Sequence, residues 1–239
     1  LVGKQFFLHP SLSIEFLERF RIGALVPIAV YADGERVTTP TVTYPPPKGN
    51  IGDLRLSGDV RLFGKHGDKV TSAIGAAVYL PTGSRDNYTS DGNTRVAPRL
   101  SIAGDAGWFT YSFRGAFHVR PLTERFDRNP LGNQIELGAA AGVRVEKIVV
   151  GPELWGSTVV DGDSFLKQQT TPLEVLLGGH YTETHGIRFG GAVGGSVARG
   201  FGSPGLRALF SLEWSPAINP PPPPPLPPKE PEPVGSPPA

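Results

Sequence analysis

Polar and apolar residues alternate along DLRLSGDVRLF, residues 53–63. Up to residue 62, the polar positions are all odd and the apolar positions are all even, with glycine at position 58. Side chains of a β-strand alternate between its two faces, so this stretch predicts a strand with one ionic face and one apolar face. The sequence of a single strand does not say which of the two faces points inward.

The same period of two recurs along residues 1–218, between clusters of Gly, Asp, Asn and Pro, and no segment in this range has a convincing helical period. The pattern predicts eleven strands. They are expected at residues 9–17, 20–31, 52–63, 69–81, 95–104, 107–120, 133–146, 147–158, 172–182, 187–199 and 205–214.

Two folds fit this alternation, a soluble β-sandwich with the apolar face inside and a transmembrane barrel with the apolar face outside. The expected strands are roughly 9 to 14 residues long, whereas strands of soluble domains cluster near 5 or 6 residues and a tilted membrane crossing needs about 9 to 11. Strand length therefore favours the membrane barrel.

The connections also alternate between short and long, which is typical of outer-membrane barrels with short periplasmic turns and long external loops. A closed barrel of this size lined with apolar side chains would enclose a void, and a hydrated ionic lining avoids it. The sequence thus predicts an all-β fold, a transmembrane antiparallel up-and-down β-barrel with a polar lumen.

An even strand count requires a twelfth strand, because the first expected strand begins on the long-loop side. We expect twelve strands when the barrel is intact and about eleven visible here, with residues 1–8 a remnant of a loop. The N-terminus LVGKQFFLHP shows no signal peptide, and a leader is expected upstream of it.

The composition of the last part of the chain differs from the rest. Residues 219–239 read NPPPPPPLPPKEPEPVGSPPA, a Pro-rich stretch that favours an extended polyproline II spacer over a folded unit. We expect residues 1–218 to form the barrel and residues 219–239 to form a Pro-rich linker or disordered tail in the periplasm. The predicted location is the cell outer membrane.

Charge and cysteine content exclude several classes of function. The formal net charge is +1 at pH 7 without a basic cluster, so nucleic acid is not an expected partner. The chain has no cysteine, which removes disulfides, thiolate metal sites and thiol nucleophiles. The expected partners are outer-membrane lipid and lipopolysaccharide.

Charged residues at the positions opposite the apolar face are the predicted lumen lining. They are Arg55, Asp59, Arg61, Lys69, Arg95, Arg99, Arg114, Arg120, Glu136, Arg144, Glu153, Glu174, Arg188, Arg207 and Glu213. Opposite charges in this set could pair and close the lumen. Alternatively, because arginine outnumbers acid, the set predicts a narrow pore that favours anions.

Apolar and aromatic residues of the other face are predicted to contact lipid. They are Leu54, Leu56, Phe109, Tyr111, Phe117, Leu137, Val143, Tyr181, Phe210 and Trp214. Aromatic members of this set are of the kind that forms girdles at the membrane interfaces. Pro27, Pro98 and Pro152 argue against uninterrupted strands, because each lacks a backbone donor.

Several segments resemble the barrel region of OmpA-family outer-membrane proteins of myxobacteria and their relatives. They are GDLRLSGDVRLFG (52–64), AVYLPTGSRDNYTSDGNTRVAPRL (77–100), GAAAGVRV (138–145), VVGPELWGSTVV (149–160) and TPLEVLLGGHY (171–181). The resemblance implies a transporter-like barrel, a Pro-rich linker and a C-terminal OmpA-like domain that binds peptidoglycan. That domain is not in this sequence, so no peptidoglycan-binding residue is assigned.

Other motifs have ordinary structural interpretations. GFGSPG, residues 200–205, matches a dinucleotide fingerprint but precedes a strand where the fingerprint requires a helix, so a hairpin turn is expected. His118, His180 and His185 are too scattered to predict a zinc site, and Asp86, Asp91, Asp161 and Asp163 do not have EF-hand spacing. No cofactor, metal site or enzymatic activity is predicted.

Three functions remain open from the sequence. The first is a structural module that links the outer membrane to the cell wall through the Pro-rich linker and contains a narrow pore. The second is a diffusion channel for small hydrophilic or aromatic solutes. The third is a soluble β-sandwich binding module.

Overall fold

The computed structural model describes residues 2–38, 43–122, 125–126 and 129–216. Its main element is an eleven-stranded antiparallel sheet, which confirms the predicted all-β antiparallel class. The strands of this sheet are β2 (Ser11–Phe16), β3 (Phe20–Leu25), β8 (Leu54–Phe63), β9 (Thr71–Leu80), β10 (Arg95–Asp105), β11 (Phe109–His118), β14 (Gln134–Val145), β15 (Ile148–Val159), β16 (Leu173–Thr182), β17 (Ile187–Ala198) and β18 (Arg207–Trp214).

Short elements lie in the connections and at the N-terminus. They are β1 (Lys4–Leu8), β4 (Ile28–Asp33) and β7 (Asn50–Ile51), which form a three-stranded sheet; the pairs β5 (Val37–Thr38) with β6 (Thr43–Tyr44) and β12 (Arg125–Phe126) with β13 (Asn129–Pro130); and the 3-10 turns η1 (Gly162–Ser164) and η2 (Gln168–Thr170). The described residues contain no helix that has both the length and the apolar character to cross a membrane.

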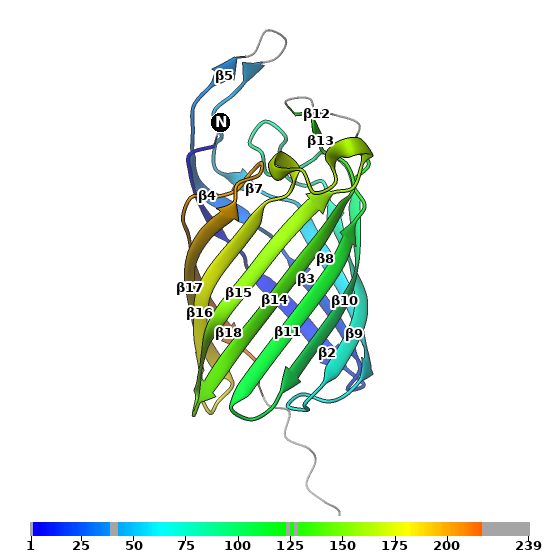
Figure 1. The fold of residues 1–239 in the computed structure, drawn as a ribbon, viewed down its shortest axis with the longest axis vertical. Coiled ribbons are helices and arrows are strands. Elements are labelled where there is room, and N and C mark those ends of the chain that lie inside the picture. Colours follow the sequence, from blue (N-terminus) through cyan, green and yellow to red (C-terminus); the bar gives the residue numbers. More distant parts are fainter. Residues whose placement is uncertain (1, 39–42, 123–124, 127–128, 217–239) are drawn as a thin grey trace, which may run out of the picture.

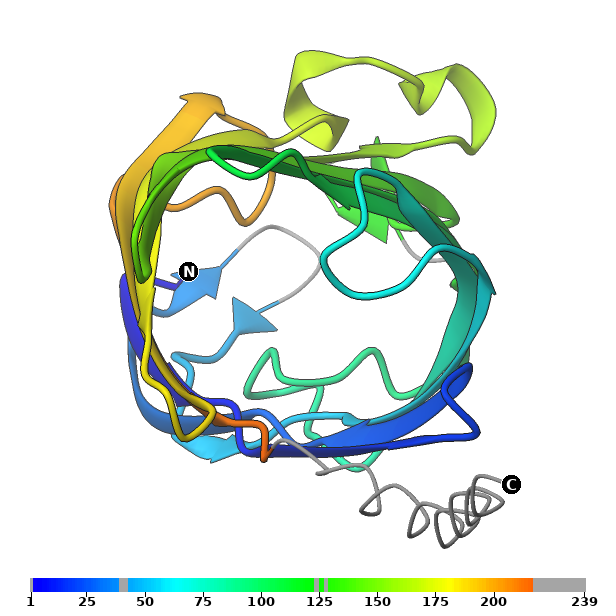
Figure 2. The ribbon, with the colours of Figure 1, turned by 90° about the horizontal axis from the view of Figure 1, so that it is seen from below.

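The main sheet curls round into a ring of inclined strands, seen from the side in Figure 1 and from one end in Figure 2. Each strand pairs antiparallel with the next along the sheet, from β18 to β2. In the described part of the chain, the edge strands β2 and β18 are not joined to each other by a hydrogen-bonded ladder. The ring is therefore open along one seam.

The N-terminal region differs from its prediction. Residues 4–8, expected in a loop, form β1 and pair with β4; the strand predicted at 9–17 begins only at Ser11, and the strand predicted at 20–31 is divided into β3 and β4. The interruptions fall at Pro10 and Pro27, which have no N–H to donate to a ladder. The carbonyl of Pro27 instead accepts the N–H of Gly52 at 2.7 Å.

Pro98 and Pro152, in contrast, lie within β10 and β15. Pro98 pairs with Ala76, and Pro152 pairs with Leu177 on one side. On the other side of Pro152, the register between β14 and β15 is interrupted between the pairs Ala140 with Glu153 and Val143 with Val150. A missing proline donor is thus tolerated where the ladder opens locally.

The two faces of the sheet differ in their surroundings. Between residues 55 and 62 of β8 the even-numbered side chains are exposed on the outer surface, where Leu56, Val60 and Leu62 are 42%, 37% and 50% exposed, and the odd-numbered ones are half-buried. No large side chain of the described residues is fully buried. A sandwich would bury its apolar face against a second sheet, so the sandwich alternative does not describe this fold.

Short turns gather at one end of the ring and long connections at the other (Figure 1). Residues 17–19, 106–108 and 146–147 connect strands at the lower end, and residues 34–38, 43–49 and 81–94 lie at the upper end. Leu17 and Glu18 both have positive φ, 51° and 53°, as in the tight turns that match the twist of antiparallel strands. The predicted alternation of connection lengths is present.

Candidate pore and its lining

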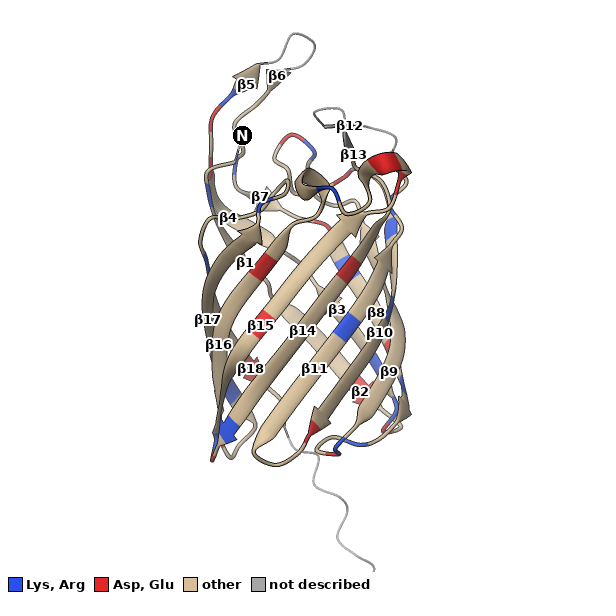
Figure 3. Cartoon of the chain, in the orientation of Figure 1, with Lys and Arg blue, Asp and Glu red and all other residues tan. Residues whose placement is uncertain are grey.

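The inner face of the curled sheet carries ionic side chains at alternate positions. Strand register places Arg55, Tyr79 and Arg95 in one row across three adjacent strands, and Asp59, Gly75 and Arg99 in another row. Figure 3 shows acidic and basic positions distributed along the strands. The predicted lining residues on this face are Arg55, Asp59, Arg61, Arg95, Arg99, Arg114, Glu136, Arg144, Glu153, Glu174, Arg188, Arg207 and Glu213.

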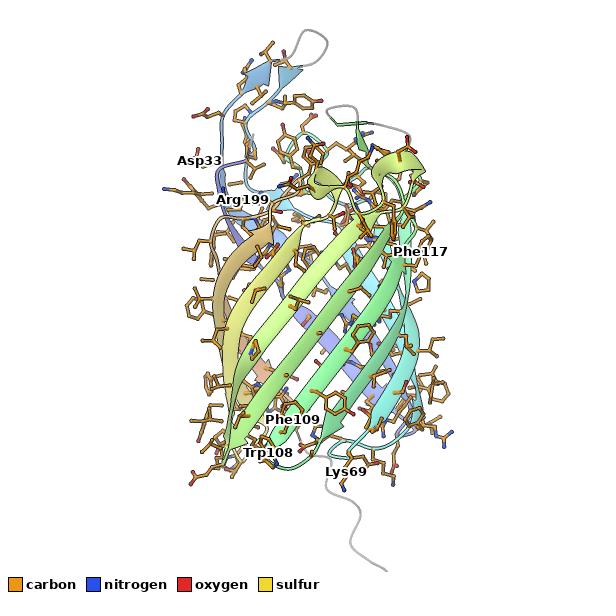
Figure 4. The ribbon with its side chains drawn as sticks, viewed as in Figure 1. Asp33, Lys69, Trp108, Phe109, Phe117 and Arg199 are labelled. Carbon is orange, nitrogen blue, oxygen red and sulfur yellow. The ribbon has the colours of Figure 1, made fainter. Side chains whose placement is uncertain are left out.

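Two residues of the predicted set lie elsewhere. Lys69 is exposed in the lower connection before β9, so its assignment to the lumen is wrong (Figure 4). The strand begins at Thr71 because residues 64–70 form the turn that the sequence reading had shortened. Arg120 follows β11 and lies at the upper rim, where its guanidinium holds the 81–94 connection.

Ion pairs on the inner face reach across an intervening strand. Arg99 on β10 donates to both carboxylate oxygens of Asp59 on β8, at 2.8 and 2.6 Å, and so passes over β9. Gly75 lies below this pair, and a Cβ there would come within 2.2 Å of Asp59 Oδ1. The glycine is therefore required by the bidentate pair above it.

A chain of ion pairs lies at the upper end of the same wall. Arg95 donates to Asp53 at 2.6 Å and contacts Asp91 at 3.0 Å, and Arg120 binds both oxygens of Asp91 at 2.9 Å. Asp53 is 2% exposed and also accepts the N–H of Gly83. These contacts fasten the 81–94 connection to the barrel wall.

Aromatic and basic groups stack beside this chain. The guanidinium carbons of Arg55 and Arg95 lie 5.0 and 4.8 Å from the centre of the Tyr79 ring. The ring of His118 is 4.7 Å from the same ring, and its Nδ1 lies 2.9 Å from Glu136 Oε1. Cation–π stacking holds charged groups without neutralising them, so Arg55 keeps its positive charge toward the lumen.

Further pairs line the rest of the inner face. Arg207 donates to both oxygens of Glu174 at 2.7 and 3.2 Å, and Glu174 is 3% exposed. The remaining pairs are Arg61 with Glu15, Arg144 with Asp105 at 2.5 Å, and Arg188 with Glu213 at 3.3 Å. The predicted pairing of opposite charges is thus extensive in the described residues.

The pairing is not complete. Within the described part of the chain, no ion pair within 4.0 Å involves Arg21, Arg55, Arg114 or Glu153. Three of these four are arginines. The unpaired charge on the inner face is therefore positive in balance.

The interior enclosed by the described residues contains a lower and an upper cavity. The lower one, about 370 Å³, is lined by Asp105, Ser112, Ala140, Glu153, His180 and Arg188 among others. The upper one, about 250 Å³, is lined by Arg120, Gln134, Trp155, Glu174, Phe201 and Arg207 among others. The two have no lining residue in common, and the pair of Glu174 with Arg207 lies on the border of the upper cavity.

The sequence reading missed several residues of the lining. Tyr79 is in the apolar stretch AAVYL and Trp155 is large and aromatic, so both were left out of a set chosen by charge. The acidic partners Glu15, Asp53, Asp91 and Asp105 were also left out of the predicted lining. Strict parity along each strand identifies Glu15 and Tyr79, whereas the role of Asp91 depends on how a loop folds back.

The outer face carries the residues predicted to contact lipid. It holds Leu54, Leu56, Phe109, Tyr111, Phe117, Leu137, Val143, Tyr181, Phe210 and Trp214, with Phe210 89% exposed. Aromatic residues gather at the strand ends nearest the short turns, and Figure 4 shows Trp108 and Phe109 at this end and Phe117 near the opposite end. Phe16 and Phe20 stack there at 5.5 Å.

The remaining sequence motifs form ordinary turns and loop contacts. GFGSPG connects β17 to β18 as a turn, with Gly202 at φ 78°. No group of three or more His, Asp or Glu side chains in the described residues is placed to hold a metal. In the 81–94 connection, burial raises the pKa of Tyr88 above its usual value, and the charge of Asp86 adds to this.

A partly exposed carboxylate caps one lower turn. Glu183 accepts hydrogen bonds from the hydroxyl of Thr184 at 2.5 Å and from the N–H of His185 at 2.7 Å. These hydrogen bonds, first that of Thr184 and then that of His185, lower the pKa of Glu183 to about 2. The turn between β16 and β17 is therefore held by a carboxylate that stays ionised in ordinary conditions.

The chain shares its fold with a known outer-membrane channel. The similar structure is the crystal structure of the COG4313 outer membrane channel from Pseudomonas putida F1, with a TM-score of 0.56 and 13% sequence identity over 86% of this chain and 79% of that chain. No family model matches the sequence, and no curated protein matches it. The resemblance to the OmpA family is thus not supported by these comparisons, and the structural likeness supports a β-barrel fold.

Proposed function

We propose that this protein is an outer-membrane channel through which small hydrophilic solutes diffuse, with a preference for anions. The observation that carries the proposal is the distribution of side chains on one curled sheet. Leucine, valine and aromatic side chains cover the outer face, and ion pairs and two cavities occupy the inside. Such a surface needs a hydrocarbon environment outside and water inside.

Strand dimensions support a membrane location. The strands β14, β15 and β17 each have 12 residues, and β8, β9, β11 and β16 each have 10. A tilted strand needs about 9 to 11 residues to cross a bilayer. The aromatic residues at the lower strand ends fit the level of lipid headgroups, and lipopolysaccharide would meet the opposite, long-loop end.

A closed barrel in a membrane needs a further strand at the seam. β2 and β18 run in the same direction, since ten antiparallel steps separate them along the sheet. Unpaired backbone groups in lipid cost several kcal/mol each. One strand antiparallel to both edges would pair them and give twelve strands, an even number. Slow amide exchange in β2 and β18 of the protein in lipid would support this, and fast exchange would contradict it.

The preference for anions rests on the unpaired charge. Arg21, Arg55 and Arg114 have no ion-pair partner among the described residues, and only Glu153 opposes them. Rings of basic side chains select anions in wide pores. The finding of a channel as structural neighbour agrees with this function better than with a purely structural role.

Planar-bilayer recording tests the proposal. The purified protein should produce discrete conductance steps, and under a KCl gradient the reversal potential should have the sign of chloride selectivity. A variant in which Arg55 and Arg114 are both replaced by glutamine should lose most of this selectivity. Absence of conductance at high protein concentration would exclude the channel.

A second candidate, a tether to the cell wall, is favoured by the position of the last described residues. The N–H of Ser215 donates to Gly186 O at 2.8 Å, so the chain leaves β18 at the short-turn end. In a bacterial barrel this is the periplasmic end. The Pro-rich residues 219–239 lie outside the described residues, and the OmpA-like link to peptidoglycan stays a proposal. Peptidoglycan sedimentation with the full gene product, compared with a product ending at residue 218, would test it.

A further inference from the structure

Three arginines of the inner face lie in the same region of the sheet as the carboxylate of Asp59. Arg21 on β3 is the register partner of Asp59 on β8, and Arg99 reaches Asp59 from β10. Arg114 on β11 is the register partner of Ser101, which lies two residues from Arg99 on the same face of β10, so Arg114 is the diagonal cross-strand neighbour of Arg99. Three positive groups and one negative group leave two positive charges in excess.

The glycine below the ion pair brings these groups together. Neighbouring strands are about 4.8 Å apart, so β3 and β10 are separated by about three such spacings. The guanidinium of Arg99 closes much of this gap, because it extends across Gly75 to reach the carboxylate of Asp59. Its charge is therefore held one strand away from Arg21.

Small residues surround Arg114 and leave its charge open. Its register partners are Ser101 on β10 and Gly138 on β14, and the nearest atom to a Cβ built on Gly138 is 3.9 Å away. Arg114 makes no ion pair with any described residue and its side chain is exposed to the interior. The guanidinium therefore has space beside it for a small bound ion.

Two nearby carboxylates have other partners, and a third, Glu153, lies over β16. Glu15 pairs with Arg61, and Glu136 lies 2.9 Å from His118 Nδ1. The carboxylate of Glu153 lies above Gly178, where a Cβ would come within 2.9 Å of its Oε1. None of these three neutralises Arg21 or Arg114 at salt-bridge distance in the described part of the chain.

We propose that Arg21, Arg99 and Arg114 form a binding site for a small oxyanion, such as inorganic phosphate or a carboxylate, inside the barrel. Guanidinium groups bind the oxygen atoms of phosphate and carboxylate through paired, charge-assisted hydrogen bonds. Arg21 and Arg114 supply free donors, and Arg99 adds positive charge while bound to Asp59. The proposal deepens the anion preference proposed above, but binding at this site does not require an open pore.

Binding is measured first without reference to conductance. Inorganic phosphate is added to the purified protein in detergent, and the broadening of the phosphorus-31 NMR line reports bound ion. Replacing Arg114 by glutamine should weaken phosphate binding about tenfold, because a charge-assisted pair is lost. Arg21→Gln should weaken it similarly, and Arg114→Lys should retain part of it.

Arg188→Gln is the matched control, since Arg188 is an inner-face arginine at the lower end that pairs with Glu213. It should bind phosphate as the unchanged protein does. Each variant is compared only after its β-sheet circular dichroism matches that of the unchanged protein. Acetate competing with phosphate would assign the site to both oxyanion classes.

The outcomes separate this site from the proposed channel. Phosphate binding that is lost in Arg114→Gln but kept in Arg188→Gln supports the site even if no current is recorded. Equal broadening in all variants, or no broadening at all, overturns the site. Conductance with chloride selectivity that is insensitive to phosphate would support the channel and contradict this site.

Discussion

The two walls of the ring use their inner faces differently. The charged wall, β8 to β11, directs Arg55, Arg61, Arg95, Arg99 and Arg114 inward, and several of them pair across neighbouring strands. The open wall, β14 to β17, directs only two of its described arginines inward, Arg144 and Arg188, and it has runs of small inward residues at positions 138, 140 and 142 and at positions 190, 192 and 194. Both walls have the same apolar outer face.

The cavities follow this difference. Of the charged wall, the upper cavity contacts only Arg120 at the rim. The lower cavity contacts only the lower ends of the charged wall's strands β9, β10 and β11, and the rest of its lining comes mainly from the open wall. The arginine side chains of the charged wall occupy the space in front of it. The smaller inward side chains of the open wall leave space for the cavities. We infer that solutes would pass along the open wall, facing the arginines of the charged wall.

The largest expected effect tests whether both walls share a lipid-facing exterior. Leu137→Arg places a charge on the outer face and should cost about 2 to 4 kcal/mol of folding free energy in lipid vesicles. Gly138→Arg points inward, where a Cβ has room, and should not carry this penalty. The folding free energies are measured by reversible unfolding in urea. Equal costs for both variants would contradict the assignment of residue 137 to the lipid face and residue 138 to the inner face.

A smaller effect is expected inside the charged wall. Gly75→Ala would put a Cβ within 2.2 Å of Asp59 Oδ1 and 2.4 Å of Gly58 O, forcing the pair of Asp59 with Arg99 apart. Overpacking of this kind typically costs about 1 to 3 kcal/mol. Gly58→Ala is the control, because no atom lies within 4 Å of its added Cβ. The unfolding temperatures of both variants are measured in detergent. An equal change in the two would show that the Asp59–Arg99 pair does not require a glycine at position 75.

The upper end of the charged wall should be sensitive to Asp91. Asp91→Asn removes the shared partner of Arg95 and Arg120, at a cost of about 1 to 2 kcal/mol for half-satisfied charged groups. We expect faster proteolysis within residues 81–94. Asp86→Asn changes an exposed carboxylate in the same connection and should leave the proteolysis rate unchanged.

Conductance should depend on the open wall. Ala140 lines the lower cavity, and Ala140→Phe should reduce single-channel conductance by about half as the cavity narrows. Ala139→Phe places the same ring on the outer face and should leave conductance unchanged. If the two variants conduct alike, the solute path does not follow the open wall.

The smallest effect concerns pH at a lower turn outside both walls. The folded pKa of Glu183, about 2, lies below its unfolded value, so its ionised form stabilises the turn above about pH 4.5 and this contribution disappears as the pH falls toward 2. Glu183→Gln should abolish this pH dependence. The pKa of Glu183 is measured by carbon-13 NMR of its carboxylate during a pH titration, and a midpoint at the ordinary value of a glutamate would contradict the lowered pKa.

Much of the fold could be read from side-chain parity. Leu56 and Arg55 alternate because successive residues of a strand face opposite sides, and the same rule located the long strands and the short turns. The interruptions at Pro10 and Pro27 and the strand at residues 4–8 were missed. The backbone hydrogen bonds in this region are made with residues far away in the sequence, such as Gly52, and the local sequence pattern does not identify these partners.

The lining was less predictable than the fold. Charge identified Arg99 and Asp59 as inward residues, but not that they meet across Gly75, because that contact requires three strands in a fixed register. Lys69 was assigned to the lumen as the first residue of the strand expected at 69–81, whereas that strand begins two residues later, at Thr71. Asp91 belongs to the 81–94 connection, and it contacts the lining arginines only because this loop folds back over the barrel end.

The sequence by itself determined the two unlike faces of each strand and the order of strands along the sheet. A period of two is a property of the extended backbone and needs no partner to be recognised. Tertiary structure alone decided which charges pair, which arginines stay unpaired and where the interior is hollow. These features depend on the curvature and register of the sheet, which bring residues tens of positions apart within a few ångströms.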